Sequence, residues 1–419
     1  MKAVIVTFLL AVLAIVATAK WTTFCTEYGT CPEVLIDVAA VGNNQLCVVG
    51  GYAASREEDK MLGVYCAPTS APETLSRLQH VNVTGMQVSI ATAFGGVTTA
   101  GIGFLNITSN LLYSHDLTTV RSSDWFGGVG QDVKAVKTPE TRTSTTALYA
   151  YVGTLALDTN EEGILLSDTG GRTYIKAPSP PNVKFLRYGA YPAPSHWFIT
   201  AGTWPESLST MQEIEDLQNR CLRLSRHVCQ PAKHLSELEI IKFNQRAYNP
   251  AARRKLSPDG KLNTYYGSIS VTTNFGNNWK TVFETDAFYF NDISCANTLN
   301  CATVAEGDKN AMVYTTNDGG ATWTKTLELT SSLMVSLMRV RVLSTTEAYV
   351  SGGMWDDAKG ALVGLIYKST DGCRTWSLET SVPDVGIMVG LSVSEDQKTL
   401  VGIGPTQDQR TIIVVNTRD

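Results

Sequence analysis

The stretch Thr316-Asn317-Asp318-Gly319-Gly320-Ala321-Thr322-Trp323 decides the fold, because three other stretches repeat its pattern. In each, Ser or Thr comes first, Asp or Asn third, Gly fifth and an aromatic residue eighth. The other copies are SDTGGRTY at 167–174, TTNFGNNW at 272–279 and STDGCRTW at 369–376. Two copies depart from the pattern, with Thr169 in the place of Asp and Cys373 in the place of Gly.

The spacing of the closing aromatic residues indicates a repeat array. Trp279, Trp323 and Trp376 follow one another at intervals of 44 and 53 residues, and Tyr174 precedes Trp279 by 105 residues, about two such periods. Self-similarity at this period is typical of propeller blades. Within each copy, Asp or Asn can accept backbone N–H groups two residues on, Gly tolerates positive φ, and we expect the aromatic residue to pack back under the turn.

These residues resemble the Asp-box, also called the bacterial neuraminidase repeat. The resemblance covers most of the chain after residue 19 and implies a β-propeller whose boxes lie away from the active face. The phrase 292–304, followed by the box at Thr316, is similar to the Asp-box propellers related to the photosystem II assembly factors. That similarity implies a binding scaffold. The Phe/Tyr-Arg-Ile-Pro element that precedes the first box in sialidases is missing here.

Reading backward from the boxes predicts an all-β, seven-bladed β-propeller, with a degenerate box at Ser114-His115-Asp116 in blade two. Alternation and β-branched residues favour half-buried strands. The expected innermost strands are 36–41, 87–91, 132–136, 185–188, 292–296, 339–343 and 387–393. The last blade runs out of chain after a third strand at 411–415, so we expect the N-terminal stretch 20–24 to join it and close the ring.

One segment breaks the period. From 205 to 262 the composition favours a partly helical insert in blade four, because apolar residues recur there at three- and four-residue steps. The insert falls between the second and third strands of its blade, which places it on the face opposite the boxes. Its later half is locally basic. It is either a solvated decoration or a lid that binds a partner.

The N-terminus is typical of a signal peptide over 1–19, with Lys2, an apolar run and the small residues Ala17-Thr18-Ala19. The expected domain is therefore 20–419, secreted into the extracellular space or the lumen of the secretory pathway, without a membrane span and monomeric. Glycosylation sequons at Asn82 and Asn106 agree with secretion. A net charge of −5 offers no basic face for nucleic acid.

Nine cysteines in an oxidising compartment predict disulfide bonds and one remaining thiol. Cys47 and Cys66 are equidistant from a turn and would face each other across two strands, as would Cys295 and Cys301. Nearest-neighbour pairing then joins Cys25 to Cys31 and Cys221 to Cys229, and leaves Cys373 alone. No spacing typical of zinc ligands occurs.

The innermost strands carry the polar pattern most suggestive of a site. Aligning their apolar alternation places charged or polar side chains at equivalent positions, with a second set two residues further in, so that both sets face the central channel. The first set is Asp37, Gln87, Asp132, Arg187, Asp292 and Arg339, and the second is Ser89, Lys134, Ser294 and Arg341.

This ring supports two hypotheses about function. The first is a binding scaffold for a protein or glycan ligand at the channel mouth and the insert, using the ring residues but not Ser89 and Ser294, with no cofactor or metal. The second is a glycoside hydrolase or lyase in which two carboxylates, with Asp132 and Asp292 as candidates, serve as acid and base. The alternative to both is that polar residues simply line a wet channel.

Overall fold

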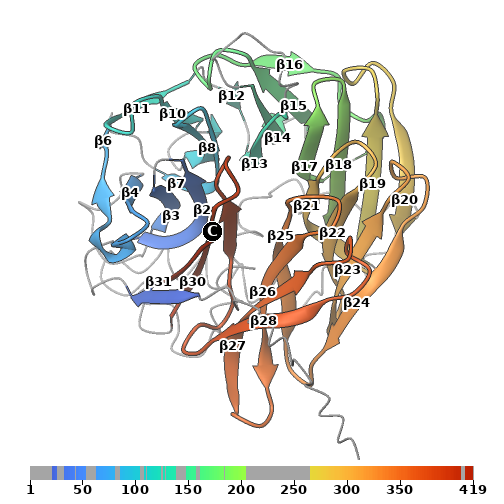
Figure 1. The fold of residues 1–419 in the computed structure, drawn as a ribbon. Helices are drawn as coiled ribbons and strands as arrows, with labels where there is room; N and C mark the ends of the chain where they lie inside the picture. The colour runs from blue at the N-terminus through green and yellow to red at the C-terminus, as the bar shows by residue number, and fades with distance from the viewer. Residues whose placement is uncertain are drawn as a thin grey trace, which may run out of the picture.

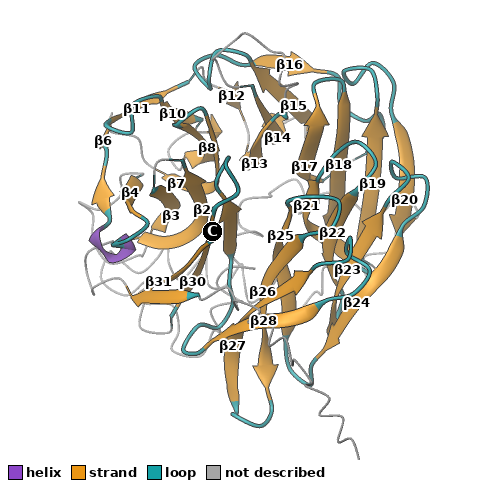
Figure 2. Ribbon diagram, viewed as in Figure 1, coloured by secondary structure: helices purple, strands orange, loops and turns teal. Residues whose placement is uncertain are grey.

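The chain forms a seven-bladed β-propeller in a computed structural model. The structure describes residues 21–25, 33–42, 44–52, 63–80, 85–103, 108–109, 111–123, 126–127, 129–137, 148–156, 161–183, 185–203, 265–406 and 411–418. Seven sheets surround a common axis, and each sheet presents one strand to that axis (Figure 1). Among the described residues, strands account for nearly all regular structure, with one short 3-10 helix, η2 (Pro72–Thr74) (Figure 2).

Blades one to three run outward from the axis in sequence order. Blade one contains β2 (Glu33–Val41), β3 (Gln45–Tyr52), β4 (Val64–Pro68) and β5 (Ser76–Arg77). Blade two contains β7 (Gly85–Ala93), β8 (Gly96–Gly103), β10 (Leu112–Ser114) and β11 (Thr119–Ser122), and the short strands β6 (Gln79–His80), β9 (Thr108–Ser109) and β12 (Phe126–Gly127) extend its sheet. Blade three contains β13 (Val129–Ala135), β14 (Tyr149–Ala156), β15 (Glu161–Ser167) and β16 (Ile175–Ala177).

Blades four to six follow the same order. Blade four contains β17 (Leu186–Ala193), β18 (His196–Thr203), β19 (Tyr266–Thr272) and β20 (Lys280–Thr285). Blade five contains β21 (Tyr289–Cys295), β22 (Cys301–Glu306), β23 (Asn310–Thr316) and β24 (Thr324–Thr330). Blade six contains β25 (Val335–Val342), β26 (Ala348–Asp356), β27 (Ala361–Ser369) and β28 (Ser377–Val382).

Blade seven combines the two ends of the described chain. It contains β29 (Gly390–Val393), β30 (Thr399–Pro405), β31 (Thr411–Thr417) and β1 (Thr22–Cys25). Strand β1 pairs antiparallel with β31, so that Thr22 faces Val415 and Phe24 faces Ile413. All seven predicted innermost strands are present, although most begin a few residues earlier than expected.

The predicted helical insert 205–262 lies outside the described residues, apart from its attachment points at the ends of β18 and β19. The end of β18 and the start of β19 lie side by side, at the other end of β19 from the box turn that begins at Thr272. No helix in the described ranges is both long and apolar enough to cross a membrane.

The four repeated turns share one hydrogen-bond pattern. The first residue accepts the N–H of the fifth, as Thr316 Oγ1 does from Gly320 at 2.9 Å. The third accepts the N–H of the seventh, as Asp318 Oδ1 does from Thr322 at 2.9 Å. The bond from the third residue therefore spans four residues and not the two expected. Thr169 Oγ1 reproduces it by accepting the Thr173 N–H, so this departure from the pattern preserves the turn.

Positive φ occurs at two successive places in these turns. The fifth place has φ of 87° at Gly320 and 64° at Cys373, and the fourth has 73° at Gly319 and 60° at Phe275. Non-glycine residues rarely adopt this conformation. The fixed turn therefore holds Phe275 and Cys373 in a conformation that their side chains disfavour.

The closing aromatic residues pack against the preceding blade. Tyr174 meets Thr98 Oγ1 of blade two at 3.0 Å, and Trp376 Nε1 donates to Thr326 Oγ1 of blade five at 3.1 Å. Trp323 also packs back on its own turn as expected, because its Nε1 lies 3.6 Å from the place of a Cβ on Gly320. A large side chain gains more by filling the wedge between two sheets than by covering one turn.

Two predicted disulfides are confirmed. Cys47 is bonded to Cys66 across β3 and β4, and Cys295 to Cys301 across β21 and β22. Cys373 is a buried free thiol, as predicted. The proposed pairs 25 with 31 and 221 with 229, and the sequons at 82 and 106, depend on residues or side chains outside the described part of the chain.

Candidate ligand site on the propeller axis

A β-bulge shapes the inner strand of blades one to six. The pairing register with the second strand slips by one residue, for example between Leu35 and Asp37 in β2 and between Phe290 and Asp292 in β21. A bulge bends the strand and re-aims the side chain that follows it. The residues that follow the bulge in blades one to six are Asp37, Ser89, Asp132, Tyr188, Asp292 and Arg339.

This register corrects the predicted ring at two places. Gln87 lies two residues before Ser89, and Arg187 occupies the bulge itself, one residue before Tyr188. The alignment was wrong there because it assumed an unbroken two-residue alternation, which the bulge interrupts. Gln87 is fully buried and accepts a hydrogen bond from Thr99 Oγ1 within its own blade.

Four side chains after the bulge connect neighbouring blades. Each accepts the N–H of the residue that follows the equivalent position in the next blade. The pairs are Asp37 with Ile90 (3.1 Å), Ser89 with Val133 (3.3 Å), Asp132 with Gly189 (3.0 Å) and Asp292 with Val340 (3.1 Å). These bonds satisfy buried N–H groups that would otherwise be costly to leave unpaired. The axial carboxylates therefore fix one blade to the next.

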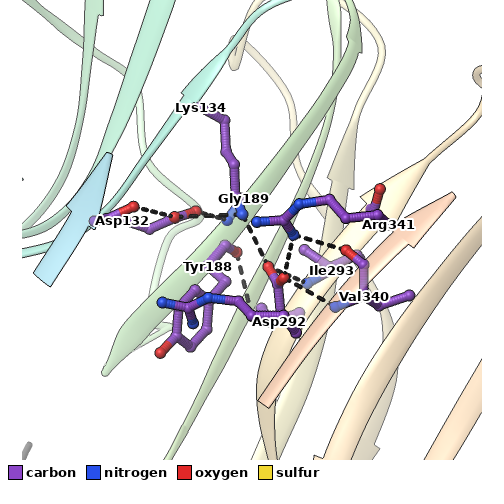
Figure 3. A network of polar contacts seen from close by, with 12 residues as sticks. Asp132, Lys134, Tyr188, Gly189, Asp292, Ile293, Val340 and Arg341 are labelled. Carbon is purple, nitrogen blue, oxygen red and sulfur yellow. Dashed lines mark hydrogen bonds and ion pairs between the residues drawn. The ribbon is translucent and has the colours of Figure 1, made fainter. Parts of the chain in front are cut away.

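Asp292 is the centre of an ion network that spans three blades (Figure 3). Lys134 Nζ, from blade three, lies 3.0 Å from Asp292 Oδ1 and 3.6 Å from Asp132 Oδ1. Arg341 Nη1, from blade six, lies 2.5 Å from Asp292 Oδ2. A separate pair joins Arg339 Nε to Asp37 Oδ1 at 3.5 Å. Residues from four different blades thus meet near the axis.

Burial divides this network into acids that are covered and cations that are partly open. Asp132 and Asp292 are 2% and 0% exposed, whereas the side chains of Lys134 and Arg341 are 20% and 16% exposed. Solvent therefore reaches the network through its cations. A ligand that approaches along the axis meets ammonium and guanidinium groups before it meets a carboxylate.

The two acids differ in their affinity for a proton. Burial raises the pKa of Asp132, and the Lys134 charge opposes this only in part. Burial also acts on Asp292, but Lys134 and Arg341 outweigh it and hold its pKa at about 2. A pair with separated pKa values can divide the roles of acid and base. Here Lys134 bridges both carboxylates, so a substrate must displace it to reach them.

A second polar group involves residues that the sequence analysis missed. The Arg187 guanidinium lies over the Tyr289 ring at 4.9 Å, and Arg187 Nη2 approaches Asn291 Oδ1 at 3.4 Å. Asn291 Nδ2 in turn donates to Glu306 Oε2 at 3.1 Å. Glu306 is 2% exposed and ends the otherwise apolar strand β22. An acid at the end of such a strand was the available signal.

Two arginines contact the ring of Tyr188. The Arg187 and Arg339 guanidinium groups each lie 5.5 Å from the centroid of its ring, one contact from blade four itself and one from blade six. Cations over an aromatic face are stabilised by the ring quadrupole. The predicted arginines therefore do not form the single carboxylate clamp of the sialidase site: Arg187 contacts Asn291, Arg339 contacts Asp37, and Arg341 contacts Asp292.

Within the described ranges, no group of three or more His, Cys, Asp or Glu side chains has the arrangement of a metal site. The charges that meet at the axis are instead of mixed sign, and the cations face solvent. This arrangement suits recognition of a polar or anionic group.

Comparison with solved structures supports the propeller fold. A structure described as YCF48 bound to D1 peptide matches with a TM-score of 0.53 at 10% identity, covering 95% of each chain. The structure of U3-55K matches with a TM-score of 0.56 at 8% identity, covering 94% of this chain and 98% of that chain. The β-propeller domain of the Trilobed protease from Pyrococcus furiosus has a TM-score of 0.50 at 9% identity and coverages of 91% and 93%.

No protein-family model matches the chain, and no curated protein sequence matches it. At identities of 10% and below, the structural matches describe architecture alone. The chain is therefore similar to β-propellers of diverse proteins.

Proposed function

We propose that this chain is a secreted Asp-box β-propeller that works as a binding scaffold for a protein or peptide ligand. The ligand engages the axial residues Asp37, Gln87, Asp132, Lys134, Arg187, Asp292, Arg339 and Arg341, together with the segment 205–262 that leaves blade four. One observation carries the proposal: the axial carboxylates are committed to contacts between blades, whereas Lys134 and Arg341 remain partly open to solvent.

This observation favours binding over catalysis for a physical reason. A general acid or base must come within hydrogen-bond reach of the substrate. Asp292 already accepts Lys134, Ile293, Val340 and Arg341, which fills the acceptor sites of both its oxygens. The similar propeller described as YCF48 bound to D1 peptide supports a peptide as the ligand class.

The test uses the chain from Lys20 to Asp419, screened on a random peptide display library and on a glycan array. The proposal expects selective peptides whose binding weakens in Lys134→Gln, because that substitution removes one of the two partly open cations. The surface variant Lys325→Gln is the matched control, since Lys325 lies on outer strand β24 and pairs with Glu328. Glycan binding without peptide binding would change the ligand class, and binding of neither would overturn the proposal.

The separated pKa values of Asp132 and Asp292 favour a second candidate, a glycoside hydrolase or lyase. In this scheme Asp132 is the acid and Asp292 the base. Turnover of a panel of glycosides by the purified chain, lost in Asp132→Ala, would replace the scaffold proposal. Absence of turnover with every substrate would remove this candidate.

We also propose that pairing of β1 with β31 closes the ring. Four residue pairs support it, and without β1 the strand β31 would expose an unpaired edge. Deletion of residues 20–25 should lower the melting temperature measured by calorimetry. An unchanged melting temperature would show that the pairing contributes nothing to closure.

Processing of the chain can be tested by mass spectrometry of secreted protein. We propose cleavage after Ala19, glycans on Asn82 and Asn106, and bonds joining Cys25 to Cys31 and Cys221 to Cys229. The two observed disulfides are compatible with an oxidising compartment. Recovery of chains that begin at Met1 would contradict the proposed secretion.

A further inference from the structure

Some hydrogen-bond donors of the axial arginines have no acceptor among the described residues, while the axial carboxylates are occupied. On the acceptor side, Asp292 Oδ1 takes Lys134 Nζ and the Ile293 N–H, and Oδ2 takes the Val340 N–H and Arg341 Nη1. A carboxylate has about four such sites, so Asp292 is filled.

Asp132 and Asp37 each accept two hydrogen bonds from the protein and are closed to solvent. Asp132 Oδ1 accepts Ser89 Oγ at 3.1 Å, and its Oδ2 accepts the Gly189 N–H at 3.0 Å. Asp37 Oδ2 accepts the Ile90 N–H at 3.1 Å, while its Oδ1 faces Arg339 Nε. Both side chains are 2% exposed. The acids of the cluster are thus occupied by groups of the protein itself.

On the donor side, Arg341 is only partly used. Its Nη1 donates to Asp292 Oδ2 and to the Val340 carbonyl oxygen, the latter at 2.7 Å. A guanidinium has five N–H donors, so Nη2 and Nε remain, with no partner in the part of the chain that the structure describes. The side chain is 16% exposed, so solvent reaches it.

Arg339 supplies a second unused donor. It lies two residues before Arg341 on β25 and is 4% exposed, yet its Nη1 has no hydrogen-bond partner among the described residues. The ring of Tyr188, 5.5 Å from its guanidinium carbon, and Asp37 hold the side chain in place. Because residues two apart on a strand point to the same face, Arg339 lies beside Arg341 on the axial face of β25.

We infer that Arg339, Arg341 and Lys134 form an oxyanion site at the axis, for a carboxylate or a similar planar or tetrahedral oxyanion. A carboxylate brings hydrogen-bond acceptors and no donors, which matches the unused N–H donors of Arg339 and Arg341. Its two oxygens suit the fork geometry of a guanidinium. The inference rests on the proposed function, since it names the chemical group by which a ligand of the axis would be held. The carboxylate comes either from a free small anion or from a peptide.

The test is calorimetric titration of the chain from Lys20 to Asp419 with sodium acetate and sodium sulfate, at an ionic strength held constant with sodium chloride. Wild type should bind at least one of the two anions at a single site. Arg341→Gln should weaken that binding about tenfold, the loss expected when hydrogen bonds from a charged donor are removed. Arg374→Gln, which removes an exposed arginine from the box turn of the same blade, should leave it unchanged.

A second pair of probes separates the two sources. A pentaalanine peptide with a free C-terminal carboxylate should compete with acetate, whereas the amidated peptide should not. If neither peptide competes, the site takes small free anions. If wild type binds neither acetate nor sulfate, or if Arg341→Gln and Arg374→Gln both bind as wild type does, the inference is overturned.

Arg341→Lys covers the case in which Arg341→Gln fails to fold. Lysine keeps the charge next to Asp292 but loses the unused donors, so binding should still weaken, and binding equal to wild type would refute the site. The results also separate this inference from the proposed function. Anion binding without any macromolecular ligand would remove only the function, and ligand binding that is indifferent to Arg341→Gln would remove only the oxyanion site.

Discussion

Replacement of Asp292 by Asn should destabilise the propeller strongly, although the side chain keeps its size. The carboxylate is 0% exposed and faces two cations and two backbone N–H groups. Asn retains one oxygen, so at least one of the N–H groups at Ile293 and Val340 would face an NH₂ group. Lys134 and Arg341 would at the same time lose their shared counter-charge.

The magnitude follows from these losses. A buried N–H without an acceptor costs about 1–3 kcal/mol. Removing one partner of a buried ion pair costs about 3–5 kcal/mol in total, because the remaining charge stays covered. Lys134 and Arg341 are partly exposed and regain some hydration, so we expect a loss of about 3–4 kcal/mol, toward the lower end of that range.

Urea unfolding followed by tryptophan fluorescence measures this loss. Asp308→Asn is the matched control, since Asp308 is exposed on the connection between β22 and β23, and it should change the free energy of unfolding by less than about 0.5 kcal/mol. Adding Arg341→Met to Asp292→Asn should recover part of the loss, because an unpaired charge is then removed. A free energy of unfolding for Asp292→Asn equal to that of the control would refute a connecting role for this carboxylate.

Three further predictions concern the box turns. Asp318→Ala should lower the free energy of unfolding by about 1 kcal/mol and Asp318→Asn by much less, because Asn274 makes the equivalent bond in blade four; thermal unfolding at pH 7 measures both. Hydrogen bonds from Thr322 lower the pKa of Asp318 to about 2. The carboxylate therefore contributes fully to the free energy of unfolding above about pH 4, and this contribution is lost as the pH falls toward 2. The acid unfolding curve of Asp318→Asn should lack this pH dependence. Burial raises the pKa of the Cys373 thiol to about 12, so peptide mapping should find it unalkylated by iodoacetamide at pH 8 until the protein unfolds.

The architecture could be predicted because its signals are local. A turn pattern repeated at similar intervals, with alternating strands between the copies, predicted the number of blades. The equal distances of Cys47 and Cys66 from one turn were enough to pair them. Each of these features depends on residues that are close in sequence. They survive substitutions such as Thr169 for Asp because the turn needs only an oxygen acceptor at that place.

The candidate site was predicted less completely because it depends on two features that sequence alternation does not record. The bulge moves Arg187 off the position that an unbroken strand would give it, and it brings Tyr188 to the axis instead. Contacts between blades then decide what each charge does. The 158-residue separation between Lys134 and Asp292 leaves no local trace of their contact.

Blades four and five show how the contacts between blades adapt where a blade lacks an axial acceptor. Blade four presents Tyr188 where blades one, two, three and five present an acceptor, so no side chain after the bulge of blade four accepts the Ile293 N–H. Asp292 Oδ1 accepts that N–H within its own blade, at 2.9 Å. The Tyr188 ring thus stands in the place of an acceptor and contacts the Arg339 guanidinium. Arg339 Nη1 has no hydrogen-bond partner among the described residues. An acid in the place of Tyr188 could accept a backbone N–H of the next blade, as Asp37 and Asp132 do. Tyr188 instead leaves Arg339 Nη1 as an unused donor at the axis.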